Sequence, residues 1–189
     1  NATQSIEIKI DTTQVYLDID IDDGAILNSS SLVVTWTVYN SVSGIDRYEY
    51  SLDRSAFVPT DVNSIELSGL FEGSHTLFVR AIDNAGRAIE NSVAFTVDTQ
   101  SPSIAFSIQD GTIFTTRSVT IAWVSTDETT GIDRFEYSLD GGAFASNGVS
   151  TTVTLPDVVD GSHVLAVRAF DAANNSAERS VSFIVDTAP

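Results

Sequence analysis

The stretch that decides the fold is residues 43–53, SGIDRYEYSLD, which returns at residues 130–140 as TGIDRFEYSLD. The offset between Gly44 and Gly131 is 87 residues. A second pair follows at an offset of 88, with GSHTLFVRAID at residues 73–83 and GSHVLAVRAFD at residues 161–171. Self-similarity at a fixed period means that one small domain is used more than once. The chain is therefore predicted to be a tandem pair of similar domains.

Composition limits the classes of protein to which the chain can belong. Its 189 residues suffice for two small domains, and the absence of cysteine excludes disulfides and thiolate metal sites. The net charge of −17 argues against binding nucleic acid or an anionic membrane surface, since both need a basic face. No apolar run approaches the roughly 20 residues of a membrane span, so no membrane insertion is expected. Because residue 1 is not Met, we expect a piece of a longer protein.

The boundaries of the repeats are marked by a recurring Val-Asp-Thr junction. It occurs at residues 97–99 and 185–187, and Asp11-Thr12 follows an alternating segment at residues 5–10 in the same way. We predict that residues 1–11 are a terminal strand or linker from a preceding repeat. Repeat one is expected at residues 12–99 and repeat two at residues 100–189. The short linkers, marked by Pro102 and Pro189, favour semi-rigid modules in series.

Apolar residues recur with a period of two in both repeats, which is typical of half-buried strands. With turn signals such as Asp23-Gly24 between them, the segments predict an all-β fold of two tandem seven-stranded antiparallel β-sandwiches. The same alternation predicts cross-strand pairs of Glu49 with Arg80 and of Glu136 with Arg168. The recurring aromatic residues are interpreted as core: Trp36, Trp123, Phe57, Phe144, Phe95 and Phe183.

Together these motifs resemble a known group of domains. A tryptophan in the second strand, SGIDRYEYSLD in the third, GSHTLFVRAID in the sixth and a closing Val-Asp-Thr are similar to the immunoglobulin-like, fibronectin-III-like repeats of bacterial and archaeal secreted and surface proteins. The resemblance covers nearly the whole chain twice. It implies an extracellular or cell-surface location and neighbouring repeats of the same chain as partners. It is weak for activity, because such repeats serve many different proteins.

The two histidines, His75 and His163, hold the same place in both repeats, just after a turn. In a fibronectin-III-like sandwich that place usually holds a tyrosine that ties the preceding corner to the backbone. We expect a histidine ring nitrogen to make the same bond. The alternative is a catalytic or metal role, which needs a nucleophile and an orienting acid nearby. Because no Gly-x-Ser-x-Gly or His-Glu-x-x-His pattern is present, the chain is predicted not to be an enzyme.

Acidic residues gather where the topology predicts the poles of the sandwiches. Ca²⁺ accepts six to eight oxygen ligands in irregular cages, so it is the cation expected between facing carboxylates. The candidate ligands at the junction between repeats are Asp22, Asp23, Asp53, Glu72 and Asp98 from repeat one, and Asp127, Glu128, Asp171 and Asn174 from repeat two. The alternative is that these acids only keep the loops soluble.

A further acidic series, Asp18, Asp20 and Asp22, resembles the start of an EF-hand loop. The sixth position is Asp23 instead of Gly and the twelfth is Ser29 instead of Glu. The acids also alternate with apolar residues, so they are interpreted as the wet face of the first strand.

Two functions agree with these features. The first is a non-catalytic spacer or stalk module of a larger adhesion or secreted protein, with or without calcium. The second is a module that binds a glycan or a surface protein through loops or through aromatic residues that the second repeat lacks. Those residues are Tyr16, Tyr39, Phe71 and Phe78.

Overall fold

The structure is a computed structural model that describes residues 14–188. The chain divides into two compact units, residues 1–97 and 98–189, and each is described by itself. The strand expected at residues 5–10, and with it the predicted segment 1–11, lies outside the described residues. Among the described residues, no helix has the length and apolar character needed to cross a membrane.

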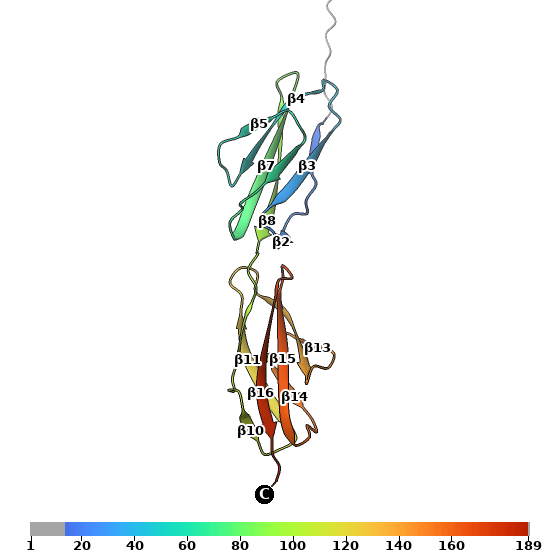
Figure 1. Cartoon of the computed structure of the whole chain (residues 1–189). Coiled ribbons are helices and arrows are strands. Elements are labelled where there is room, and N and C mark those ends of the chain that lie inside the picture. The colour runs from blue at the N-terminus through green and yellow to red at the C-terminus, as the bar shows by residue number, and fades with distance from the viewer. Residues whose placement is uncertain (1–13, 189) are drawn as a thin grey trace, which may run out of the picture. The chain divides into compact units, whose positions relative to one another are not determined.

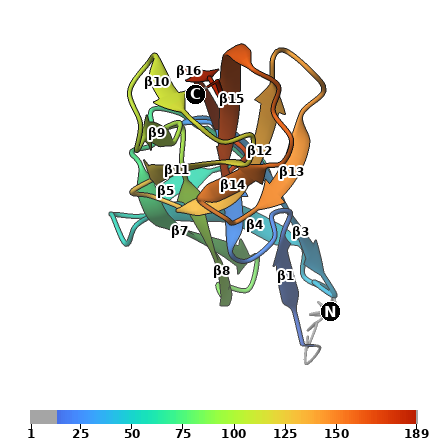
Figure 2. The same ribbon diagram turned by 90° about the horizontal axis from the view of Figure 1, so that it is seen from below.

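Each unit consists of a three-stranded sheet packed on a five-stranded sheet (Figures 1 and 2). In unit 1 the three-stranded sheet has the order β1-β3-β6 and the five-stranded sheet the order β2-β8-β7-β4-β5. The strands are β1 (Tyr16–Ile19), β2 (Ala25–Leu27), β3 (Leu32–Tyr39), β4 (Ile45–Leu52), β5 (Val58–Thr60), β6 (Ser64–Leu67), β7 (Gly73–Asp83) and β8 (Ala88–Val97).

Unit 2 repeats this arrangement strand for strand. Its sheets have the orders β14-β11-β9 and β10-β16-β15-β12-β13. The strands are β9 (Ser103–Phe106), β10 (Thr112–Phe114), β11 (Val119–Thr126), β12 (Ile132–Leu139), β13 (Ala145–Gly148), β14 (Thr152–Leu155), β15 (Gly161–Asp171) and β16 (Ser176–Val185). The predicted all-β fold of two sandwiches is confirmed.

Within residues 14–188 each unit has eight strands, one more than the sequence predicted. The additional strands are β2 and β10, which pair parallel with the last strand of their own unit, while the other pairings are antiparallel. In unit 1 the chain leaves β1, turns at Gly24 (φ 82°) and crosses to the other sheet. A three-residue strand contains too few positions for alternation to be recognised, which is why the prediction missed it.

The alternation within the strands decides which side chains form the core. Val34 and Trp36 of β3 are buried, and Val33 and Thr35 beside them are exposed. Trp36 meets Tyr48 edge-on with the ring centroids 5.7 Å apart. In unit 2 Trp123 meets Phe135 at 5.6 Å, again edge-on. Fully burying a large apolar side chain contributes about 1.5–3 kcal/mol, so each unit has its own stabilising core.

A tight turn follows β4, and its counterpart follows β12. Asp53 (φ 53°) and Arg54 (φ 60°) form the centre of the first turn, and Asp140 (φ 52°) and Gly141 (φ 72°) that of the second. Positive φ at both central positions defines a type I′ hairpin turn, in which Asp and Gly are favoured. The turn places the aspartate beside the first residues of β7 or β15.

Candidate functional site

The histidine of each unit is buried near the start of its longest strand. His75 of β7 is 8% exposed, and its Nε2 lies 2.8 Å from the carbonyl oxygen of Phe71. Its Nδ1 lies 2.8 Å from Oδ2 of Asp53, in the turn after β4. The ring packs against Phe95 of β8, with the centroids 5.5 Å apart. The predicted bond from a ring nitrogen to the backbone of the preceding corner is therefore confirmed.

Unit 2 repeats the contacts almost unchanged. Nε2 of His163 lies 2.8 Å from the carbonyl oxygen of Val159, and Nδ1 lies 2.7 Å from Oδ2 of Asp140. The aspartate partner was not predicted, since it comes from a turn 22 or 23 residues earlier in the chain. Because both nitrogens of each ring already have a partner, neither ring is available as a base for a nucleophile. We refer to the two groups below as the histidine corners.

The surroundings change the acid–base behaviour of the corners. Burial lowers the pKa of His75, but hydrogen bonds to Phe71 and Asp53 outweigh it, so the pKa is raised above its ordinary value. The bond to Asp140 raises the pKa of His163 against the opposing effect of burial. Burial raises the pKa of Asp53 and of Asp140, yet hydrogen bonds from the histidine and from a backbone amide bring both below their ordinary value.

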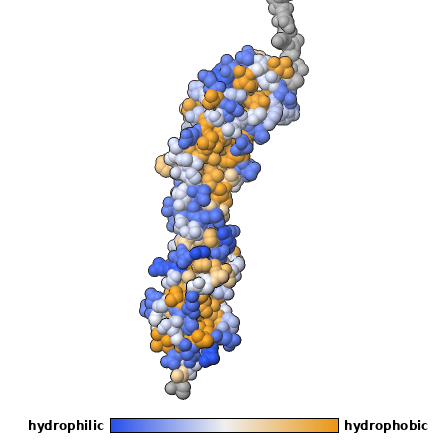
Figure 3. Space-filling view, turned by 45° about the vertical axis from the view of Figure 1, so that its right-hand side comes forward, coloured by the Kyte–Doolittle hydropathy of each residue, from blue (hydrophilic) through white to orange (hydrophobic). Residues whose placement is uncertain are grey.

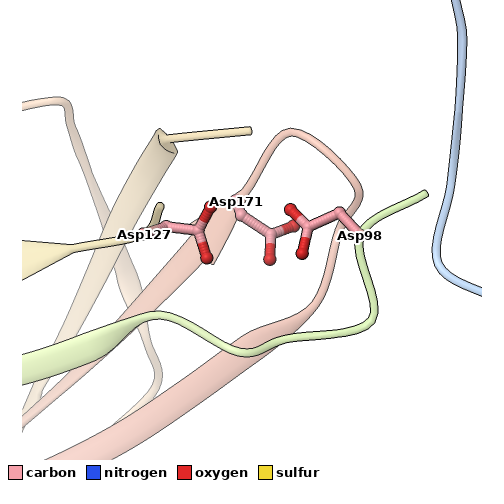
Figure 4. A group of neighbouring side chains, drawn as sticks. All are labelled: Asp98, Asp127 and Asp171. Carbon is pink, nitrogen blue, oxygen red and sulfur yellow. The ribbon is translucent and has the colours of Figure 1, made fainter. Parts of the chain in front are cut away.

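A second group of interest, the carboxylate cluster, consists of Asp98, Asp127 and Asp171 (Figure 4). Asp98 begins unit 2, Asp127 follows β11, and Asp171 ends β15. One oxygen from each carboxylate lies within 4.8 Å of the others. Asp98 and Asp171 are almost completely buried, at 0% and 1% exposure. Figure 4 shows Asp171 between the other two, with the carboxylates in a row.

Hydrogen bonds from polar groups hold the cluster in place. Asp98 accepts bonds from the hydroxyl of Thr130 and from the amide of Gln100, and Asn175 donates to its carbonyl oxygen at 2.8 Å. Asn175 also donates to both carboxylate oxygens of Asp171, through its backbone at 2.8 Å and its side chain at 2.9 Å.

Asp127 is held by its own loop. Its Oδ1 accepts bonds from the backbone amides of residues 129, 130 and 131. No basic side chain among residues 14–188 forms an ion pair with a member of the cluster, so the three negative charges are met only by neutral donors.

At the same place in unit 1 the positive charge comes from an arginine side chain. Asp83, the counterpart of Asp171, is 5% exposed and pairs with Arg87, whose Nε lies 2.8 Å from Oδ2. Two backbone amides also donate to Asp83, and the pKa of its carboxyl is lowered, first by the amide of Arg87 and then by the guanidinium. Asn175 stands where unit 1 has Arg87, and Asn40 stands where unit 2 has Asp127.

The other expected calcium ligands are described within their own units. Asp22 and Asp23 form the turn between β1 and β2, where Asp23 accepts a bond from the amide of Ala94. Asp53 is bound to His75, and Glu72 lies in the turn before β7. Glu128 is exposed, and Oδ1 of Asn174 accepts a bond from Arg134 at 3.1 Å. Of the nine residues the structure brings together Asp98, Asp127 and Asp171, and a site that joins acids of both repeats stays a prediction.

The interpretation of the EF-hand-like series as the wet face of a strand is confirmed for Asp18, which lies in β1, whereas Asp20 follows that strand and Asp22 lies in the turn after it. Asp18 and Asp20 are exposed, and Asp20 accepts a hydrogen bond from the hydroxyl of Thr35 at 3.1 Å. Leu17 and Ile19, which alternate with them, are buried.

The interpretation of the recurring aromatics is wrong for two of them. Phe57 and Phe144 lie outside the cores, each beneath an arginine on the outer face of the five-stranded sheet. The guanidinium of Arg80 is 4.0 Å from the ring centre of Phe57, and that of Arg168 is 3.7 Å from Phe144. The other four, Trp36, Trp123, Phe95 and Phe183, are core as predicted.

The aromatic residues that only repeat one has are not gathered in one place. Tyr16 and Tyr39 face each other across β1 and β3, and each is 51% exposed. Phe71 is 83% exposed in the turn before β7, and Phe78 of β7 lies under the guanidinium of Arg54 at 5.2 Å. On the face drawn in Figure 3, hydrophobic and hydrophilic residues are interspersed on both units.

Comparison with known proteins defines the fold. A solved structure of fibronectin(III)-like modules of Clostridium thermocellum CbhA is 18% identical in sequence, with a TM-score of 0.53 over 92% of this chain and 94% of that chain. The fold is fibronectin-III-like. No family model matches the sequence.

A sequence relative places such modules within a larger protein. Chitinase A1 of Niallia circulans is 27% identical over 172 residues, which is 86% of this chain and 24% of the chitinase. The two fibronectin-III-like modules thus match about a quarter of that enzyme.

Proposed function

We propose that the two modules are a non-catalytic spacer within a larger secreted or cell-surface protein, in a stalk or adhesion role. The observation that carries the proposal is the repetition of core and histidine corner in both modules. Trp36 and Trp123 fill equivalent cores, and His75 and His163 make equivalent contacts. The buried histidines bond to groups of their own module, which is expected of side chains that stabilise the fold. Neighbouring repeats of the same chain are its direct partners.

Small-angle scattering tests the spacer role in solution. A spacer must keep its modules in series, so the expected profile is that of an extended particle, and a single compact particle would overturn the proposal. Because the relative from Niallia circulans is a chitinase, chitin is the control substrate. We expect no release of sugar from chitin and no retention of the chain on it.

We further propose that the carboxylate cluster binds Ca²⁺ and stiffens module 2. Three carboxylates within 4.8 Å of one another carry three negative charges, and two of them are buried. Like charges at such distances destabilise one another unless a cation or strong donors compensate. Carboxylate oxygens are the ligands that Ca²⁺ prefers, and an ionised carboxylate has about four lone-pair sites, more than the two hydrogen bonds described above occupy at Asp98 and at Asp171. The arginine in the same place of module 1 supports the need for a cation.

Thermal unfolding in EDTA and then in millimolar CaCl₂ tests the calcium proposal. Each module has one tryptophan in its core, so the variant Trp36→Phe reports on module 2 and Trp123→Phe on module 1. Neither indole N–H has a hydrogen-bond partner within residues 14–188, so Phe removes no hydrogen bond. A ligand present at 100 times its Kd stabilises the folded state by about 2.7 kcal/mol.

A calcium-dependent rise in the melting temperature of module 2 is the expected result, with a smaller rise or none in module 1. Identical curves for module 2 in EDTA and CaCl₂ would show that the acids serve solubility only, and would leave the spacer role untouched.

The alternative function is binding of a glycan at the Tyr16–Tyr39 pair. The observation that favours it is that the two half-exposed rings occupy opposite positions of β1 and β3. In module 2 the same positions hold Ser103 and Thr126, whose hydroxyls bond to each other at 2.7 Å. A glycan array tests this, with the double variant Tyr16→Ser/Tyr39→Thr as the matched control. Binding that is lost in the variant supports the alternative, and an array without hits removes it.

A further inference from the structure

Each histidine ring faces two groups that accept hydrogen bonds. For His163 these are a carbonyl oxygen at 2.8 Å from Nε2 and a carboxylate oxygen at 2.7 Å from Nδ1. A carbonyl oxygen has no proton to donate, and an ionised carboxylate has none either. Both ring nitrogens must therefore carry a proton to make both bonds. A ring protonated at both nitrogens is an imidazolium cation.

We propose that the two histidine corners are charged imidazolium–carboxylate pairs that make each module pH-sensitive, firm in mildly acidic solution and loosened above neutral pH. The device is present twice, with His75 bound to Asp53 and His163 bound to Asp140.

The aspartates are fixed as acceptors. Oδ1 of Asp53 accepts the backbone amide of Thr76 at 2.8 Å, and Oδ1 of Asp140 accepts that of Val164 at 2.9 Å. Each carboxylate therefore has one oxygen bound by the backbone and the other by the ring. This arrangement favours the ionised acid, so the shared proton belongs to the imidazole.

The other contacts described for the two rings are made by uncharged groups. The last strand of each module contributes an aromatic ring, Phe95 or Phe183, and the turn before β7 or β15 contributes the carbonyl oxygen. The acids next to these carbonyls are Glu72 and Asp160. Asp160 accepts bonds from the hydroxyl of Thr187 at 2.9 Å and lies 3.5 Å from Arg117.

The direction of the pH effect follows from the proton count. The pKa of both histidines is raised on folding, so their contribution is complete below the ordinary value of about 6.5 and is lost as pH rises through the raised pKa. The pKa of Asp53 and Asp140 is lowered, so their contribution is present above the ordinary value of about 3.9 and is lost as pH falls through the lowered pKa. The corner is therefore strongest between these two limits.

Loss of the proton affects one pole of each module. A neutral imidazole retains one N–H, so either the carboxylate or the carbonyl oxygen then faces a lone pair. In module 2 the corner ties the turn after β12, with Asp140, to the turn before β15, with Val159. Gly161 pairs there with Val185, at the end of the last strand. Deprotonation therefore loosens these two turns, which lie at the pole where the last strand of the module ends.

Nitrogen NMR of the imidazole rings in the whole chain measures the protonation directly. The chain has only two histidines, one in each module, so the spectrum contains two rings and the variant His163→Gln assigns them. We expect both nitrogens of both rings to stay protonated at pH values where an unperturbed histidine, with a pKa of about 6.5, is neutral. A ring that becomes neutral with a midpoint at or below about pH 6.5 would overturn the proposal.

Unfolding as a function of pH tests the consequence for stability. In the Trp36→Phe background, the folding equilibrium constant of module 2 should fall between pH 6.5 and 9, up to about tenfold for each pKa unit by which folding raises the histidine. With His163→Gln in this background the fall should disappear from module 2. The same variant in the Trp123→Phe background should keep the fall of module 1, which serves as the control. An unchanged slope in His163→Gln would refute the proposal. If that variant does not fold, the NMR titration of the unaltered chain decides alone.

Discussion

The two modules build the same turn at one pole and place different charges in it. In module 1 the amide of Asp83 bonds to the carbonyl of Arg87 at 2.9 Å, and in module 2 the amide of Asp171 bonds to that of Asn175 at 3.2 Å. The backbone is therefore the same, but the arginine compensates the buried acid of module 1, while module 2 has an asparagine there and a further acid at residue 127. The comparison teaches that the fold fixes where a carboxylate is buried, and that single neighbouring residues decide whether its counter-charge is built in.

The largest difference between the modules is expected in the core. Phe135 is 2% exposed against Trp123, whereas its counterpart Tyr48 is half-buried against Trp36. Phe135→Ala should lower the free energy of unfolding of module 2 by about 3–5 kcal/mol, because it leaves a cavity in a closed site. Tyr48→Ala should cost module 1 about 1–3 kcal/mol. Urea unfolding followed by the tryptophan of the affected module measures both, and equal losses would contradict the comparison.

These core positions are the part of the fold that could be predicted from the sequence. Alternation with a period of two needs only a strand of sufficient length, and β3, β7 and β8 provide eight to eleven residues each. Glu49 lies opposite Arg80 and Glu136 opposite Arg168 for the same reason, and the predicted pair of Glu49 with Arg80 is confirmed at 3.5 Å. The predicted pair of Glu136 with Arg168 is wrong, because Arg168 pairs with Glu178 on the neighbouring strand instead. Short segments gave no such signal, which explains the missed strand β2 and the misplaced ring of Phe57.

The candidate sites were less predictable, because they depend on contacts between distant segments. The bond of a histidine to its corner could be expected from its place after a turn. The aspartate 22 residues earlier could not, although the Asp53 and Asp140 that recur in both repeats were a signal. Asp98 was assigned to the end of repeat one, yet its hydrogen bonds to Thr130 and Asn175 join it to module 2. No local pattern reveals on which side of a junction a residue packs.

Introducing an arginine beside the buried Asp171 should remove the stabilisation of module 2 by calcium. Asn175→Arg places a guanidinium beside Asp171, as Arg87 lies beside Asp83. We expect it to stabilise module 2 in EDTA by about 0.5–1 kcal/mol and to abolish the stabilisation by CaCl₂. Calorimetric titration with Ca²⁺ and melting in EDTA measure the two effects.

The matched control for this exchange is Arg87→Asn in module 1. It removes the cation from Asp83 and should lower the melting temperature of that module by a few degrees, without creating the three-acid cluster, since Asn40 remains neutral. A full calcium response in the Asn175→Arg variant would show that the cluster is not the binding site.

The smallest expected difference concerns the outer face of the five-stranded sheets. Glu49 lies 3.5 Å from Arg80 and 3.2 Å from Arg47, whereas Arg168 pairs at 2.8 Å with Glu178 and forms no ion pair with Glu136 among the described residues. Exposed ion pairs contribute about 0–1 kcal/mol, so Glu49→Gln should destabilise module 1 by no more than about 0.5 kcal/mol and Glu136→Gln should leave module 2 unchanged. Melting curves at low and at high salt measure this, because screening removes only the effect of Glu49→Gln. A larger loss of stability in Glu136→Gln than in Glu49→Gln would contradict this expectation. It would show that the ion pair of Glu49 is not the source of the stabilisation at this position of the sheet.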